Sequence, residues 1–224
     1  VEAQVEAGLS SLRMDRERQQ HFQSTLLADA LDTIRALVLY GRVPPVPKVN
    51  DVVAGGKREQ AEILAEGGVD LLALEMCEHP EASPLAVEAA LATGLPVWVG
   101  LSCKRDPETD RLVGFDSFEL DFDFESLIGA LAAYDIGVIN VMHSSIEDTV
   151  PCLEAVKRQW AGPRGAYPES GYFKAPRWEF TDIIEPDDLV SEARTWIDGG
   201  VQLIGGCCGL GPRHIAALNE AFGT

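Results

Sequence analysis

Short apolar runs alternate along the chain with longer stretches in which apolar residues recur at a helical period. Six of the apolar runs have the length of a β-strand and cover residues 36–41, 69–76, 96–103, 136–143, 165–168 and 201–208. Near-continuous apolar strands indicate burial on both faces, as in a parallel sheet that is covered by helices. The pattern therefore predicts buried, parallel strands.

The stretches between these runs carry the signals of helix ends. Ser83 and Pro84 open one stretch and Gly94 ends it, and helices are predicted over residues 56–68, 83–94, 123–135, 145–162, 186–200 and 212–222. Serine is a preferred N-cap, proline suits the first helical position, and glycine commonly ends a helix. The chain thus reads as repeated β–α units.

Such repeats build either an open doubly wound sheet or a (β/α)8 barrel. No glycine-rich nucleotide motif follows any of the predicted strands. Polar and metal-competent residues gather instead at the C-terminal ends of several strands, at Glu75, Cys103, Asn140, His143, Tyr167, Cys207 and Cys208. This distribution favours a TIM-type barrel, whose active site is assembled from many strand ends. With six predicted strands, the barrel lacks its first two strands in this chain.

Composition limits which partners the protein can bind and where it can reside. The formal net charge is −18, and so acidic a surface repels nucleic acids and anionic membranes. Hydrophobic residues make up 46% of the chain, enough for a sizeable core, yet no apolar run approaches the ~20 residues of a membrane span. No signal peptide is recognisable. We therefore expect one cytoplasmic domain, residues 1–224, that acts on small molecules.

Five cysteines at irregular spacing do not suggest a disulfide framework, which leaves metal binding or thiol chemistry. Cys207 and Cys208 are adjacent and are flanked by glycines at a strand end, just before a helix predicted to start at Pro212. The dipole of that helix is expected to favour thiolates. Two thiolates are half of a tetrahedral zinc site. The alternative is a pair of small buried residues in a tight turn.

The segment that holds these cysteines, residues 196–218 (WIDGGVQLIGGCCGLGPRHIAAL), resembles the C-terminal signature of the homocysteine S-methyltransferases. Residues 61–76, 92–103 and 165–171 are similar, in order, to the fourth, fifth and seventh strand regions of that family. The resemblance covers residues 56–222, as strands four to eight, and is weak over residues 1–55. It implies a zinc ion that activates the thiol of homocysteine for methylation to methionine.

The resemblance also implies site residues. Cys207 and Cys208 match two of the family's three zinc cysteines, and Glu75 matches a glutamate that binds the amino group of the substrate. Asn140 and Tyr167 match further residues of the substrate site. The methyl donor is left open, because betaine, S-methylmethionine, S-adenosylmethionine and methylcobalamin all serve relatives.

The chain departs from the family at the third zinc ligand. The family pattern is Gly-Val-Asn-Cys, and alignment on Asn140 puts Val141, which cannot bind a metal, in the place of the cysteine. His143 lies two residues further on, so strand alternation would point it to the same side, and a Cys2His site is chemically sound. Cys103 is the second candidate, and a site without a third protein ligand is the remaining alternative.

The second departure concerns the first two strands, which hold the amino acid in the family and have no counterpart here. Either the sequence is cropped, or a homo-oligomer or a partner chain completes the barrel, or the strands are lost. A second hypothesis for function follows: a divergent or partial barrel that binds a metal or a partner without catalysis of its own.

Overall fold

The structure is a computed structural model that describes residues 49–115, 122–174 and 179–223. The chain divides by its internal contacts into residues 1–48 and a second unit, Val49–Thr224, which is the unit described here. The predicted strand over residues 36–41 lies outside the described residues, and a single domain over the whole chain stays a prediction.

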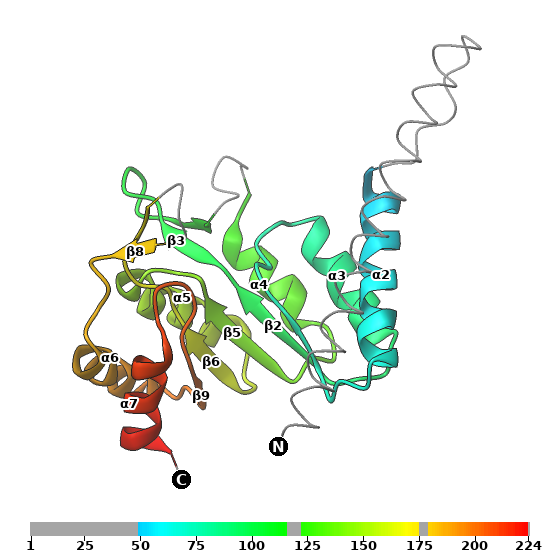
Figure 1. Cartoon of the computed structure of the whole chain (residues 1–224). Helices are drawn as coiled ribbons and strands as arrows, with labels where there is room; N and C mark the ends of the chain where they lie inside the picture. The colour runs from blue at the N-terminus through cyan, green and yellow to red at the C-terminus, as the bar shows by residue number, and fades with distance from the viewer. Residues whose placement is uncertain (1–48, 116–121, 175–178, 224) are drawn as a thin grey trace, which may run out of the picture. The chain divides into compact units, whose positions relative to one another are not determined.

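Five parallel strands form the central sheet, in the order β1-β2-β5-β6-β9 (Figure 1). Their bounds are Leu72–Leu74, Val97–Leu101, Val138–Met142, Arg164–Tyr167 and Leu203–Ile204. Four of these strands lie within a predicted apolar run and are shorter than it, because the runs include loop residues next to the strand, and β6 is shifted by one residue from the run predicted over residues 165–168. The parallel α/β architecture is confirmed, with β1 and β9 at the edges of the described sheet.

Helices alternate with these strands as the sequence predicts: α2 Val49–Glu66, α3 Ala82–Leu91, α4 Phe124–Ala132, α5 Ile146–Gln159, α6 Pro186–Asp198 and α7 Pro212–Phe222. Asp123 and Ser145 cap α4 and α5 through their side chains, and Gly94 follows α3 with φ of 76°. The predicted N-cap Ser83 instead lies inside α3, where its hydroxyl accepts a hydrogen bond from the His79 N–H. None of the described helices is long and apolar enough to cross a membrane.

The core lies between the sheet and the helices that contact it. Helix α3 packs on β1 and β2, and α5 packs on β5 and β6. Alternate strand residues on this face are fully buried, and the register places them side by side: Val99, Leu101, Ile139, Val141 and Ala166. Val141, which stands where the family has a zinc cysteine, is thus part of the core.

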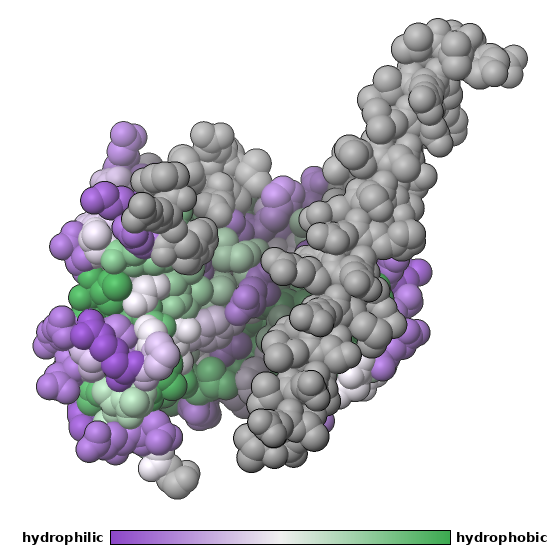
Figure 2. All heavy atoms as spheres, viewed as in Figure 1, coloured by the Kyte–Doolittle hydropathy of each residue, from purple (hydrophilic) through white to green (hydrophobic). Residues whose placement is uncertain are grey.

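The opposite face of the sheet is less covered by the described residues. Ala73 is exposed, and Trp98, Tyr167 and Leu203 are partly exposed. In the view of Figure 2, apolar residues (green) lie over the middle of the sheet and hydrophilic residues (purple) lie mostly around its rim. A parallel sheet is normally covered on both faces. We therefore expect polypeptide outside the described residues to cover this face.

Two antiparallel hairpins were not predicted. One pairs β3 (Cys103–Arg105) with β4 (Leu112–Gly114), and the other pairs β7 (Tyr172–Lys174) with β8 (Glu179–Thr181). The predicted strand over residues 96–103 is in fact two strands, because the chain leaves the central sheet after β2. Cys103 is disulfide-bonded to Cys152 of α5, so the expectation of free cysteines is wrong for this pair.

His214 ties the start of α7 to the chain before α6. The ring is buried, its Nδ1 accepts a hydrogen bond from the Gly211 N–H at 3.1 Å, and its Nε2 lies 2.8 Å from the Ile184 carbonyl oxygen. Because Nδ1 is the acceptor, Nε2 must carry the proton and donate it to Ile184. The loop that carries Cys207 and Cys208 leads into this helix start.

We expect His214→Ala to lower the free energy of unfolding by about 2–4 kcal/mol, because it removes a buried ring and leaves two backbone groups without partners. Urea denaturation followed by circular dichroism measures the change. Arg213→Ala is the matched control, since Arg213 is exposed and its ion pair with Glu185 is worth little. Equal loss in the two variants would contradict this account of His214.

Candidate metal centre

The candidate site lies beyond the C-terminal ends of the parallel strands. His143 follows β5 directly, Tyr167 ends β6, and Cys207 and Cys208 lie in the loop that follows β9. Because parallel strands end at a common edge of the sheet, residues that are 64 positions apart in the sequence come into contact there.

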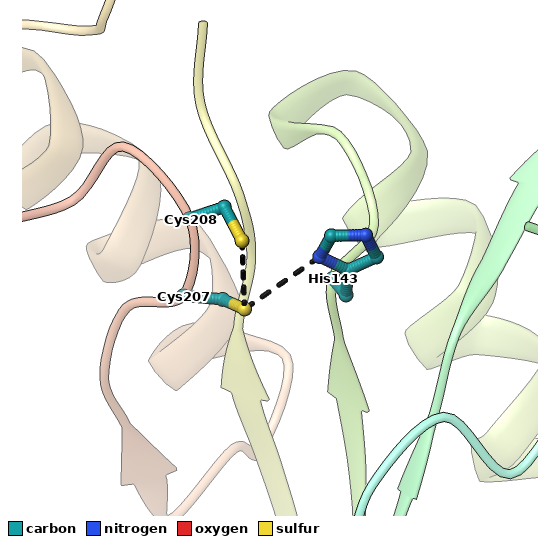
Figure 3. A group of neighbouring side chains, drawn as sticks. All are labelled: His143, Cys207 and Cys208. Atoms are coloured by element: carbon teal, nitrogen blue, oxygen red, sulfur yellow. Dashed lines mark hydrogen bonds between the residues drawn. The ribbon is translucent and has the colours of Figure 1, made fainter. Parts of the chain in front are cut away.

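Three of the predicted ligands meet at this edge (Figure 3). The Cys207 sulfur is 3.8 Å from the Cys208 sulfur and 3.6 Å from His143 Nδ1. All three donor atoms lie within 4.8 Å of one another, and all three residues are partly buried. In the described part of the chain this is the one group of His, Cys, Asp and Glu residues with donor atoms so close together.

These distances fit a tetrahedral metal ion. Zinc, with bonds of about 2.3 Å to sulfur and about 2.0–2.1 Å to imidazole nitrogen, separates two sulfurs by about 3.8 Å and sulfur from nitrogen by about 3.6 Å. Two of the three observed separations, 3.8 and 3.6 Å, match these values, and the third pair, Cys208 and His143, lies within 4.8 Å. Two thiolates and an imidazole are also a donor set that zinc prefers.

His143 reaches the cysteines by a different route from the one predicted. Strand β5 ends at Met142, and His143 has a φ of 45°, so strand alternation no longer sets its direction. Positive φ is uncommon for a residue with a side chain and needs support from its surroundings. Here the Ser102 hydroxyl donates to the His143 carbonyl oxygen, and the Ser144 hydroxyl donates to the Met142 carbonyl oxygen.

The loop of residues 205–211 is fixed by backbone hydrogen bonds to the segment after β6. The Cys207 N–H donates to the Pro168 carbonyl at 2.8 Å, and the Cys208 carbonyl accepts from the Ser170 N–H at 3.0 Å. Gly209 has a φ of 79°, and a Cβ there would collide with the Ser170 carbonyl oxygen. Only glycine allows this close approach, so the glycine after the cysteines has a steric role.

Electrostatics in the absence of metal oppose a thiolate. Burial, helped by the neighbouring Cys208 and Glu75, raises the pKa of Cys207 to about 11 against the opposing effect of the Cys208 backbone N–H. The expectation that the dipole of α7 favours a thiolate is therefore wrong for Cys207. Helix α7 starts at Pro212, so several residues separate the cysteines from its first turn. A cation is needed to hold both sulfurs ionised.

Glu75 and Tyr167, predicted to bind substrate, lie close to this group. Burial raises the pKa of the Tyr167 hydroxyl, and the negative charges of Glu75 and Cys207 add to the effect. The same Glu75 charge acts on Cys207. Gly100 leaves room for the tyrosine, since a Cβ there would lie 2.7 Å from its hydroxyl. The two residues therefore share the edge of the sheet with the cysteines.

Asn140 lies deeper, within β5, and is buried. Its Nδ2 donates a long hydrogen bond of 3.5 Å to the Val99 carbonyl, and its Oδ1 has no partner among the described residues. Gly165, its neighbour on β6, leaves space for the amide. A buried amide oxygen without a partner is costly and calls for a donor, and a substrate would be one source.

Cys103 does not join the metal group. Its sulfur is bonded to Cys152 and is buried, and a disulfide sulfur is not the thiolate that zinc binds. Glu169, in contrast, was not predicted: its Oε2 lies 3.1 Å from His143 Nδ1. The sequence signal was its position two residues after Tyr167, at a strand end.

The fold and the site can now be set beside known proteins. A family model described as homocysteine S-methyltransferase matches residues 15–222. The chain belongs to the homocysteine S-methyltransferase family. Among curated relatives, betaine–homocysteine S-methyltransferase 1 of Mus musculus is 30% identical over 173 residues, which cover 73% of this chain and 42% of the relative. Homocysteine S-methyltransferase 2 of Arabidopsis thaliana is 28% identical over 188 residues, which cover 81% of this chain and 53% of the relative.

A solved structure shares the family fold. The metallated form of the homocysteine methyltransferase MmuM from Escherichia coli superposes with a TM-score of 0.60 at 23% identity, over 79% of this chain and 53% of that chain. The chain therefore spans about half the length of the relatives and of the structure that it matches. The matched region includes the loop of Cys207 and Cys208 and the helix α7 that follows it.

We expect iodoacetamide to label Cys207 and Cys208 in the native, metal-free protein and to spare Cys77. Cys77 is 3% exposed, and burial raises the pKa of its thiol to about 12. Since the pKa of Cys207 is also raised, to about 11, its labelling rate should increase roughly tenfold per pH unit from pH 7 to 10.

Peptide mass spectrometry measures the labelling, with Cys77 as the internal control. Saturating zinc should protect Cys207 and Cys208, because a metal-bound thiolate is a weaker nucleophile and is sterically covered. Equal labelling of these cysteines with and without zinc would contradict a metal site there.

Proposed function

We propose that this chain is a zinc-dependent S-methyltransferase that transfers a methyl group to the thiolate of homocysteine and forms methionine. The observation that carries the proposal is that the donor atoms of Cys207, Cys208 and His143 lie within 4.8 Å of one another, with two of the three pairs at 3.6 and 3.8 Å. Family membership supplies the reaction class. The ligands of this site are then two thiolates and one imidazole.

In this proposal, three residues bind the metal and two bind the substrate. Cys207, Cys208 and His143 hold the metal and leave one tetrahedral position for a substrate. When bound, zinc lowers the pKa of a thiol, so that a nucleophilic thiolate exists at neutral pH. Glu75 pairs with the amino group of the substrate in this proposal. Tyr167, whose raised pKa keeps its hydroxyl protonated, is available as a hydrogen-bond donor.

We further propose that the parallel sheet is part of the (β/α)8 barrel that the family resemblance implies. In support, β1 and β9 leave open edges and one sheet face is partly uncovered within the described residues. Further strands of the same polypeptide, a second copy, or a partner chain would cover them. A zinc–thiolate site needs Cys207 and Cys208 reduced, which suits the cytoplasm, whereas a disulfide such as Cys103–Cys152 is rare there.

The second hypothesis, a metal- or partner-binding barrel without catalysis, is favoured by one observation. Val141 is fully buried in the core, so the cysteine that the family pattern carries there has no equivalent at the site. The metal-binding form of this hypothesis shares the site at Cys207 and Cys208 and differs from the first only in turnover, whereas the partner-binding form needs no metal there.

Elemental analysis should find about one zinc ion per chain in the protein purified under reducing conditions. Cys207→Ala and His143→Ala should each lose most of it, because two protein donors do not retain zinc well. Cys77→Ala is the matched control, as it removes a free cysteine that lies outside the group. Full zinc in Cys207→Ala would rule out the assigned site.

Methionine formation from homocysteine then separates the two hypotheses. The zinc-loaded protein is assayed with betaine, S-methylmethionine, S-adenosylmethionine and methylcobalamin in turn. Turnover that Cys207→Ala abolishes supports the methyltransferase. Stoichiometric zinc without turnover for any donor would favour the binding role.

A further inference from the structure

We propose that Phe115 is a positioning residue for the histidine of the metal group. Its ring packs against the imidazole of His143 and fixes the plane in which Nδ1 faces Cys207 and Cys208. The inference rests on the proposed function, since it requires a metal at His143, Cys207 and Cys208. Phe115 is not a ligand itself and acts only through His143.

The rings of Phe115 and His143 are in direct contact. Their centroids lie 4.8 Å apart and their planes are inclined by 61°, which is the edge-to-face arrangement that aromatic rings favour. Phe115 is partly buried, and the Lys104 ammonium group lies 5.3 Å from the centre of its ring. Within the described part of the chain, Phe115 is not among the apolar side chains that pack against the hydrophobic core. Its ring therefore contributes to the edge of the site more than to the core.

Ser102 holds the backbones of both ring residues. It is fully buried where the chain leaves β2, its hydroxyl donates to the His143 carbonyl at 3.3 Å, and its carbonyl accepts from the Phe115 N–H at 3.3 Å. Cys103, the first residue of β3, donates its N–H to the Ser144 hydroxyl at 3.1 Å. The hairpin of β3 and β4 is thus bonded to the chain around His143, and Phe115 follows the end of that hairpin directly.

Hydrogen bonds do not hold the imidazole once a metal is bound. Nδ1 lies 3.6 Å from the Cys207 sulfur and 3.1 Å from Glu169 Oε2, and it cannot donate a proton to Glu169 and give its lone pair to a metal at the same time. A metal-binding histidine usually donates a hydrogen bond from its other nitrogen. Here that nitrogen, Nε2, points away from the cysteines in Figure 3 and has no hydrogen-bond partner among the described residues. The orientation of the ring then depends on packing.

Packing against Phe115 meets this need. The lone pair of Nδ1 lies in the plane of the imidazole, so the metal must lie in that plane as well. The torsion that sets the plane is broad for a histidine, and a partly exposed ring without a neighbour would leave the plane poorly defined. The contact with Phe115 involves the ring and not the Nδ1 lone pair, so it persists when His143 binds a metal.

The test uses cobalt(II) as the metal probe and the whole chain. Cobalt affinity is measured by competition with a chelator in the unaltered protein and in its variants. Phe115→Ala should weaken cobalt binding by about three- to tenfold, because an edge-to-face ring pair contributes on that order. Phe115→Tyr, which keeps the ring, should bind cobalt within about twofold of the unaltered protein.

Phe222→Ala is the matched control. Phe222 is also partly buried beside a cation, with Arg194 5.1 Å from the centre of its ring, but it lies at the C-terminal end of α7. Because Phe222 packs against the core, thermal unfolding followed by circular dichroism should show at least as much loss of stability as for Phe115→Ala. The cobalt affinity of the control should be unchanged.

A double-mutant cycle shows whether Phe115 acts through His143. His143→Ala keeps both cysteines and should bind cobalt more weakly, and adding Phe115→Ala should weaken binding no further, because no imidazole is left to position. Equal cobalt affinities for Phe115→Ala and Phe222→Ala would overturn the proposal. So would the same several-fold weakening by Phe115→Ala with and without His143. Absence of cobalt binding by the unaltered protein would instead refute the proposed function, which keeps the two failures distinct.

Discussion

The candidate site depends on the short segment of residues 168–170, which is hydrogen-bonded on both sides. Its backbone accepts from Cys207 and donates to Cys208 on one side, and it donates to Ser144, beside His143, on the other. Metal ligation tolerates errors of only a few tenths of an ångström in donor position. The loops that follow β5, β6 and β9 are held next to one another here because the middle one is hydrogen-bonded to both of its neighbours.

Burial and charge explain why such a site needs a cation. Partial burial and the proximity of Cys208 and Glu75 raise the pKa of Cys207, and buried surroundings with two negative groups raise that of Tyr167. Glu169 adds a further carboxylate next to His143. Cys207 and Tyr167 are thus costly to ionise, and a divalent ion bound at Cys207 would offset that cost for its thiolate.

The sequence predicted the parts of this fold that depend on periodicity. Near-continuous apolar runs identified the parallel strands, and the glycine-flanked Cys207 and Cys208 identified the centre of the site. Backbone detail could not be predicted: the chain leaves β2 after Leu101 to form a hairpin, and Cys103 pairs with Cys152. Glu169 was missed because its one sequence signal, a position two residues after Tyr167 at a strand end, does not show that the carboxylate turns toward His143. His143 was predicted, but through strand alternation, which does not hold at a residue with positive φ.

Val141 departs from the family pattern, and His143 is the residue that could compensate for it. Val141 replaces a cysteine, yet its side chain packs in the core between sheet and helices, so a thiol at that position in this backbone would face the core and not the metal group. The third possible ligand atom comes instead from His143, two residues further on, where a positive φ directs the imidazole toward the cysteines. The carboxylate of Glu169 contacts that same imidazole. His143 is thus the residue that brings a third possible ligand atom to Cys207 and Cys208, which Val141 cannot do.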